Sequence, residues 1–186
     1  MSELALTVML VLFFLAGEAF FSGSEYLLIS FSRLRLRTLA EGGMGAARIL
    51  EEILKTPDRI FGATSVGTNL CVVASSALVT AYLAGTYLGE RADLYSFLIM
   101  GPVTLILGEI VPKILFREKA ETLAPWIAAP LKGSLTLFAP ILAVTSLIAR
   151  GILSLFIPKD GFPSSMVTRE ELLALTKMSQ VKLSLE

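Results

Sequence analysis

The sequence contains no histidine and only one cysteine, Cys71, among its 186 residues. Histidine is the commonest transition-metal ligand and general base, so its absence argues against a zinc site, a haem site and histidine-dependent hydrolysis. A single cysteine excludes an intramolecular disulfide and a CxxC site. Charge is scarce as well: Asp, Glu, Lys and Arg make up 17% of the chain, and the formal net charge is zero. That balance excludes a general nucleic-acid binder.

Hydrophobic residues are abundant where charge is scarce. They make up 54% of the chain, and the mean hydropathy is +0.74, whereas roughly 25% of the residues in an ordinary soluble domain are charged. This composition predicts an integral membrane protein. The length allows one compact membrane domain and little else.

Three apolar segments are long enough to cross a bilayer, and they cover residues 4–30, 60–83 and 94–116. The first is too long, and too polar in its second half, for a cleaved signal peptide. The loop that follows it contains Arg33, Arg35 and Arg37, so the positive-inside rule places this loop in the cytoplasm. We therefore expect the N-terminus to lie outside, and three crossings then leave the C-terminal side in the cytoplasm.

Residues 120–157 allow two interpretations. The segment 120–132 is short, whereas 134–157 is long enough to span but contains Pro140 and Arg150. The second segment is either a fourth span or part of a helical hairpin on the cytoplasmic interface, where Trp126 and Lys132 would lie at headgroup depth. Residues 158–179 are expected to begin a cytoplasmic helical bundle with Thr168 as an N-cap, and residues 180–186 resemble a tail.

Each of the three expected spans contains a polar island. The islands are Ser22, Ser24 and Glu25; Gly67, Thr68 and Asn69; and Gly108 and Glu109. An acid at membrane depth marks a functional site by default. Pro112 has no N–H to offer the Gly108 carbonyl four residues back, which frees an oxygen beside Glu109 and predicts a helix kink. Oxygen donors on three helices favour a small hard cation such as Mg²⁺, although Na⁺ accepts the same chemistry.

Structural explanations compete with this one at every position. The serines can bond back to their own helix, Asn69 can join two helices, and Glu109 with Lys113 can form an i,i+4 ion pair. Three islands together make a shared site the better explanation.

The first island also has a geometric constraint. Glu18, Ser22 and Glu25 follow the spacing of one helix face, whereas Ser24 lies about 200° away from Ser22 on a regular helix. Both serines can be direct ligands only if a π-bulge interrupts the helix near Gly23. Glu18 has no assigned role at this point.

Five segments are similar, in the same order, to the transmembrane domain of the CorC and cyclin M (CNNM) family of magnesium transporters. They are Phe20–Glu25 (FFSGSE), Ser32–Leu36 (SRLRL), Gly67–Leu70 (GTNL), Gly108–Lys113 (GEIVPK) and Val167–Leu172 (VTREEL). The resemblance covers roughly residues 5–175, and GEIVPK is its most specific element. Thr68 departs from the family pattern, which commonly has Asn or Gly there.

The resemblance implies an all-α homodimer in which each protomer has three transmembrane helices and a cytoplasmic juxtamembrane helical belt. It makes residues 1–157 the transmembrane domain, with 134–157 in the belt and not spanning. It also implies a multi-pass protein of the plasma or inner membrane, with its N-terminus outside and its C-terminus cytoplasmic. In full-length members, nucleotide-binding CBS domains follow the helical bundle.

The resemblance further implies a site for a dehydrated magnesium ion, the transported substrate, with sodium as the coupling ion. Its metal ligands would be Ser22, Asn69 and Glu109, with backbone carbonyls at Gly67 and Gly108. Ser24 and Glu25 are candidates for a second cation site.

Three functions follow from these observations. The first is a secondary transporter and not an enzyme, in which sodium drives magnesium export by alternating access. The second is a magnesium sensor or regulatory membrane scaffold without transport. The third is an intramembrane hydrolase in which Lys113 activates Ser22, although Lys113 lies near a helix end where it stays hydrated.

Overall fold

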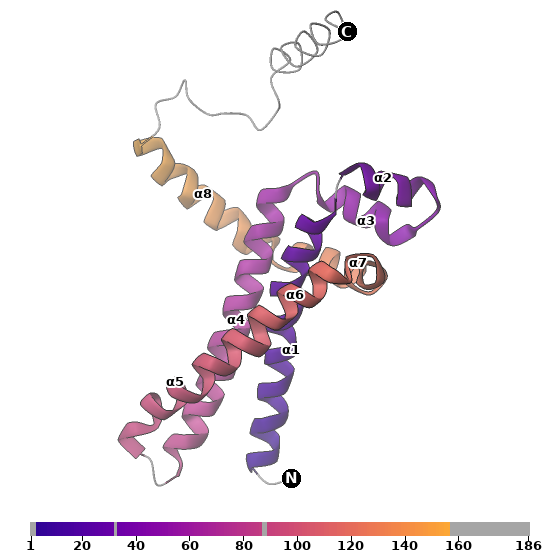
Figure 1. The fold of residues 1–186 in the computed structure, drawn as a ribbon. Helices are drawn as coiled ribbons and strands as arrows, with labels where there is room; N and C mark the ends of the chain where they lie inside the picture. The colour runs from indigo at the N-terminus through magenta and orange to yellow at the C-terminus, as the bar shows by residue number, and fades with distance from the viewer. Residues whose placement is uncertain (1–2, 32, 87–88, 157–186) are drawn as a thin grey trace, which may run out of the picture. The chain divides into compact units, whose positions relative to one another are not determined.

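The computed structural model describes residues 3–31, 33–86 and 89–156, and every regular element in these ranges is a helix (Figure 1). Three helical stretches are long and apolar enough to cross a membrane: α1 (Glu3–Ser30), α4 (Pro57–Ala84) and the continuous stretch Gly89–Glu118. The predicted all-α fold with three helices able to span a membrane is therefore confirmed. Helix α4 runs without a break through the polar island at Gly67–Asn69.

The third span changes its helical type in the middle. It begins with the short 3₁₀ helix η1 (Gly89–Arg91) and continues as α5 (Ala92–Val103), the π-helical segment η2 (Thr104–Ile110) and α6 (Val111–Glu118). The N–H of Val111 donates to the carbonyl of Ile106, five residues back. Pro112 follows at the start of α6. The helix beside Glu109 is thus a π-helix, and the kink predicted at Pro112 stays a prediction. Pro112 has no N–H to donate, so the carbonyl without a donor is that of Leu107 in π register or that of Gly108 in α register.

Helix α1 packs against both other spans through glycines. A Cβ at Gly67 of α4 would lie 2.5 Å from the Phe21 ring, and a Cβ at Gly23 of α1 would lie 2.6 Å from the Phe116 ring. Each glycine therefore leaves room for an aromatic ring of the neighbouring helix. Small residues at helix crossings are typical of membrane proteins, because they let backbones approach closely.

Three shorter helices gather around one end of α1 (Figure 1): α2 (Arg33–Glu41), α3 (Gly45–Ile53) and α7 (Ala120–Leu137). Their apolar faces form the main hydrophobic core of the described residues, together with the ends of α1 and α4. Its fully or nearly fully buried leucines are Leu27, Leu36, Leu50 and Leu131. Burial of apolar surface away from water stabilises this end of the molecule.

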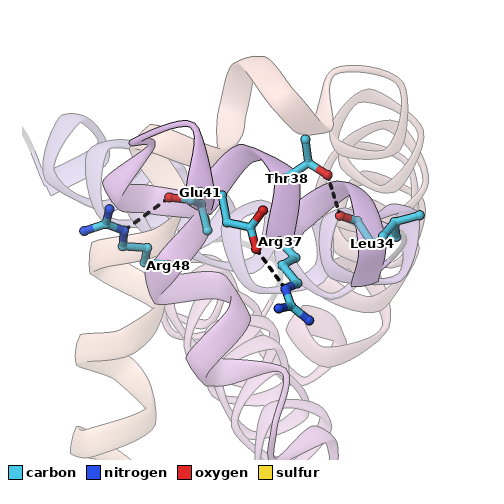
Figure 2. Close-up of polar contacts among 6 residues, drawn as sticks. Leu34, Arg37, Thr38, Glu41 and Arg48 are labelled. Carbon is cyan, nitrogen blue, oxygen red and sulfur yellow. Dashed lines mark hydrogen bonds and ion pairs between the residues drawn. The ribbon is translucent and has the colours of Figure 1, made fainter.

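Polar contacts lie within α2 and between α2 and α3 (Figure 2). Arg37 Nε donates to Glu41 Oε1 over 3.0 Å, and Thr38 Oγ1 donates to the Leu34 carbonyl over 3.0 Å. Arg48 Nε of α3 donates to the Ala40 carbonyl of α2 over 3.3 Å. Gly43 has a φ of 93°, which a residue with a side chain rarely adopts, so glycine suits this turn.

Helix α8 (Ala139–Phe156) follows α7 after a break at Phe138. Helix α7 and residues 139–148 of α8 are long and apolar enough to cross a membrane only if they are counted together as one bent span. The first compact unit of the chain ends at Ala143, inside α8, and the end of the membrane domain at residue 157 stays a prediction. Residues 158–179, with the expected cap Thr168, and residues 180–186 lie outside the described ranges.

Ion pairs join α7 to the other two short helices. Arg35 of α2 pairs with Glu121 of α7, and Lys132 Nζ of α7 donates to Glu52 Oε2 of α3 over 2.7 Å. The hydrogen bond and the charge of Lys132 hold the pKa of Glu52 below its ordinary value. Both side chains are exposed, so we expect a small contribution to stability.

This pair predicts a pH-dependent effect of Lys132→Gln on the melting temperature. Because the pKa of Glu52 is lower in the folded state than in the unfolded state, the pair stabilises the fold above the unfolded pKa. The contribution is lost as the pH falls through the folded pKa. We expect Lys132→Gln to lower the melting temperature slightly near pH 7, and we expect this difference to shrink steadily as the pH falls below the ordinary carboxyl pKa of about 4.3. Lys119→Gln is the control, and a difference that persists undiminished in acid would contradict the prediction.

Candidate functional site

Two polar side chains of α1 are buried without hydrogen-bond partners. Glu18 is 0% exposed and Ser22 is 2% exposed. Both Glu18 carboxylate oxygens and Ser22 Oγ are without a partner among the described residues. The two residues are four apart and share one face of the helix. Buried polar groups are nearly always satisfied in proteins, so three orphaned oxygens side by side mark a site with a missing partner.

The π-helical segment forms the opposite wall of this site. A Cβ at Gly108 would lie 2.2 Å from Glu18 Cδ and Oε1 and 2.6 Å from Oε2. The carboxylate of α1 therefore lies directly against the backbone of the third span, where only glycine leaves room for it. Single π-helical turns within α-helices are frequent at functional sites.

Glu109, the next residue, is in a different situation from Glu18. Its Oε2 accepts a hydrogen bond from Lys113 Nζ over 3.3 Å, and the side chains are 37% and 30% exposed. The Lys113 ammonium also lies 5.5 Å from the centre of the Tyr26 ring. This is the i,i+4 ion pair that the sequence offered as a structural explanation. The role of Glu109 as a metal ligand stays a prediction.

The second island on α4 is divided between two environments. Gly67 is buried against Phe21. Asn69 is exposed, and its Nδ2 donates to the carbonyl of Ser65 on the same helix over 2.8 Å. The Asn69 amide therefore bonds within α4 instead of joining α4 to another helix, and its role as a metal ligand also stays a prediction.

Ser24 and Glu25 have partners, unlike Glu18 and Ser22. Ser24 Oγ donates to the Phe20 carbonyl over 2.6 Å, so back-bonding describes Ser24 but not Ser22. Glu25 Oε2 accepts from Thr64 Oγ1 of α4 over 3.2 Å. Helix α1 is α-helical throughout Glu3–Ser30, with no π-bulge near Gly23, so Ser22 and Ser24 point in different directions.

Of the predicted ligands, Ser22 is buried on the same face of α1 as Glu18, and Gly108 lies against the Glu18 carboxylate. Glu18, to which the sequence analysis gave no ligand role, is therefore the residue that links them. The signal that identifies Glu18 is its place on the same helix face as Ser22. Within the described ranges, no three Asp, Glu, His or Cys side chains lie together as a metal cluster. A cation at this site would therefore take hydroxyl and backbone oxygens as well as carboxylates.

Comparison with known proteins gives a consistent set of relatives. The family model described as "Cyclin M transmembrane N-terminal domain" matches residues 9–186. The UPF0053 inner membrane protein YfjD of Escherichia coli (strain K12) is 29% identical over 171 residues, which cover 90% of this chain and 39% of the relative. A UPF0053 protein of Haemophilus influenzae is 27% identical over 155 residues, or 83% of this chain and 37% of the relative. The chain thus spans about two fifths of the length of these relatives.

Proposed function

We propose that this chain, which belongs to the cyclin M family of transmembrane domains, is the membrane domain of a magnesium ion transporter. The observation that carries the proposal is the buried pair Glu18 and Ser22, which share one face of α1 without a partner among the described residues, with the Glu18 carboxylate against Gly108 of the third span. Polar and acidic side chains inside a membrane protein are costly, and they mark ion pathways. Carboxylate, hydroxyl and carbonyl oxygens are the ligands that Mg²⁺ prefers.

In this proposal Ser22, Asn69 and Glu109 bind the transported magnesium ion through their side chains, and Gly67 and Gly108 contribute backbone oxygens. Sodium is the coupling ion, with Ser24 and Glu25 as candidates for a second cation site. Asn69 would have to turn inward from its exposed position, and Glu109 would have to exchange Lys113 for the ion. These changes suit a carrier that alternates between two states.

The π-helical segment supplies a place where such a change can occur. Its hydrogen bonds have a different register from those of α5 and α6, and Pro112 cannot donate a bond at the start of α6. Helix α6 can therefore move relative to α5 while only a few backbone hydrogen bonds change partners. We propose that this segment is the hinge for alternating access, with sodium entry coupled to magnesium export.

The same proposal includes an orientation and an assembly. The chain is a multi-pass protein of the plasma or inner membrane, with its N-terminus outside and its C-terminus cytoplasmic. Residues 120–132 and 134–157 belong to a cytoplasmic juxtamembrane belt, together with α2 and α3, and two protomers form a homodimer. The basic loop after α1 supports the orientation, and "inner membrane protein" in the name of the Escherichia coli relative supports the location. Nucleotide-binding CBS domains would belong to the longer protein.

A flux measurement tests the proposal. The purified chain is reconstituted in liposomes, and internal magnesium is followed with a dye, with and without an opposing sodium gradient. We expect sodium-dependent flux that falls at least about tenfold in Glu109→Gln. Glu118→Gln, an exposed change in the same span, should leave the flux unchanged. Unchanged flux in Glu109→Gln would show that this carboxylate is not a ligand of the transported ion. Magnesium binding without any flux would favour a sensor or scaffold.

The hydrolase interpretation receives no support from the geometry. Such a mechanism requires Lys113 to accept the proton of Ser22 Oγ. Lys113 Nζ instead pairs with Glu109 and stays partly exposed, and Ser22 Oγ has no hydrogen-bond partner in the part of the chain that the structure describes.

A further inference from the structure

The two acids beside the π-helical segment differ in charge balance. Glu109 has Lys113 as a counter-charge at 3.3 Å. None of the ion pairs within the described ranges includes Glu18, although its side chain is completely enclosed. An ionised Glu18 therefore needs a cation as its counter-charge, whereas Glu109 already has Lys113.

We propose that Glu18 is the main anionic ligand of a hard metal cation bound within the membrane, with Ser22 Oγ as a neighbouring ligand and the Gly108 turn as the wall of the site. The inference rests on the proposed function, because it concerns the same site. It adds a ligand to the set proposed above: Glu18 of α1 holds the ion in the arrangement described here, in which Lys113 neutralises Glu109, and Glu109 joins when it exchanges Lys113 for the ion.

Three observations support this assignment. Each unsatisfied atom, Glu18 Oε1 and Oε2 and Ser22 Oγ, is an oxygen that can accept, so one cation can satisfy all three at once. The absence of a Cβ at Gly108 allows the carboxylate to reach the backbone of the third span. Glu18 is also enclosed within a single protomer, so neither a partner protomer nor lipid is needed to complete its burial.

Sodium and magnesium both fit oxygen ligands of this kind, so the test measures each of them. The full chain is placed in lipid nanodiscs, and binding of radioactive ²²Na⁺ and of Mg²⁺ is measured separately at equilibrium. Glu18→Gln retains the shape of the side chain and removes its charge. The control is Glu3→Gln, which makes the same chemical change at an exposed position of the same helix.

We expect Glu18→Gln to weaken binding of at least one of the two ions by at least about tenfold, with Glu3→Gln equal to wild type. The ion whose binding falls is the occupant. The melting temperature should rise with that ion in wild type but not in Glu18→Gln. Glu18→Asp keeps the charge but shortens the side chain by one methylene, so it should bind more weakly than wild type and more tightly than Glu18→Gln. If Glu18→Gln is poorly folded, the comparison of Glu18→Asp with wild type still tests the proposal.

Two outcomes separate this inference from the proposed transport. Ion binding that depends on Glu18, in a chain without flux, would leave the cation site standing and overturn the carrier. The opposite result is flux together with binding of both ions that is unchanged in Glu18→Gln and in Glu18→Asp. It would overturn the cation site at Glu18 and leave the carrier standing. It would also mean that the buried carboxyl is kept neutral.

Discussion

Gly108→Ala should reduce magnesium flux at least about tenfold while the chain remains folded. The new methyl group would lie 2.2 Å from the end of the Glu18 side chain, which is far too close for a non-bonded contact. The helix backbone on both sides is constrained by packing, but the carboxylate ends a flexible side chain. Glu18 is therefore the group that must move, and we expect it to leave the position in which it faces the π-helical turn.

Two comparisons make this experiment specific. Gly101→Ala introduces the same methyl group in the same span, where nothing lies within 4 Å, and should leave the flux unchanged. The double variant Gly108→Ala with Glu18→Asp shortens the crowded side chain, so part of the lost flux should return. Normal flux in Gly108→Ala would mean that transport does not require Glu18 against this turn. Circular dichroism should report the same helix content in every variant.

The sequence was sufficient to predict the long helices of this fold. The three apolar runs are long, and a lipid environment leaves a polypeptide few alternatives to a helix. Ser22 and Gly108 were predicted as site members because polar or small residues are unusual within apolar runs, and this assignment stays a prediction. The family match extends over residues 9–186, a range that includes both positions.

Whether each polar residue is buried or exposed could not be predicted from the sequence. Successive residues point about 100° apart on a helix, so the rotation of a helix against its neighbours decides which side chain is enclosed. That rotation places Glu18 inside and Asn69 outside. It depends on contacts between distant segments, such as the Phe21 ring against Gly67, which a single sequence does not reveal.

The π-helix was unpredictable for a related reason. Pro112 indicated a break in hydrogen bonding near Glu109, and the observed irregularity covers Thr104–Ile110, just before that proline. A π-helical turn inserts a residue into the α-helical register, and its position depends on what the displaced residue packs against. Here Gly108 packs against Glu18. The sequence analysis instead considered a π-bulge near Gly23, where the helix is regular.

Gly67→Ala should destabilise the chain and, through packing, also abolish transport. The added Cβ would lie 2.5 Å from Cγ and Cδ2 of Phe21, and an aromatic ring cannot fold away as the end of a glutamate side chain can. Helices α1 and α4 must then separate, and overpacking of this kind typically costs about 1–3 kcal/mol. The melting temperature in nanodiscs should fall, whereas Gly133→Ala, in open space on α7, should not lower it.

A second substitution separates packing from ligation at this position. Alanine has the same backbone carbonyl as glycine, so a ligand role for Gly67 is retained in Gly67→Ala if the helices can return to their places. Phe21→Leu removes the ring and makes room for the new methyl group. We therefore expect Gly67→Ala with Phe21→Leu to recover both the melting temperature and the magnesium flux. Recovery of stability without recovery of flux would show that Gly67, Phe21 or both act in transport beyond this contact, and Phe21→Leu alone would then identify which.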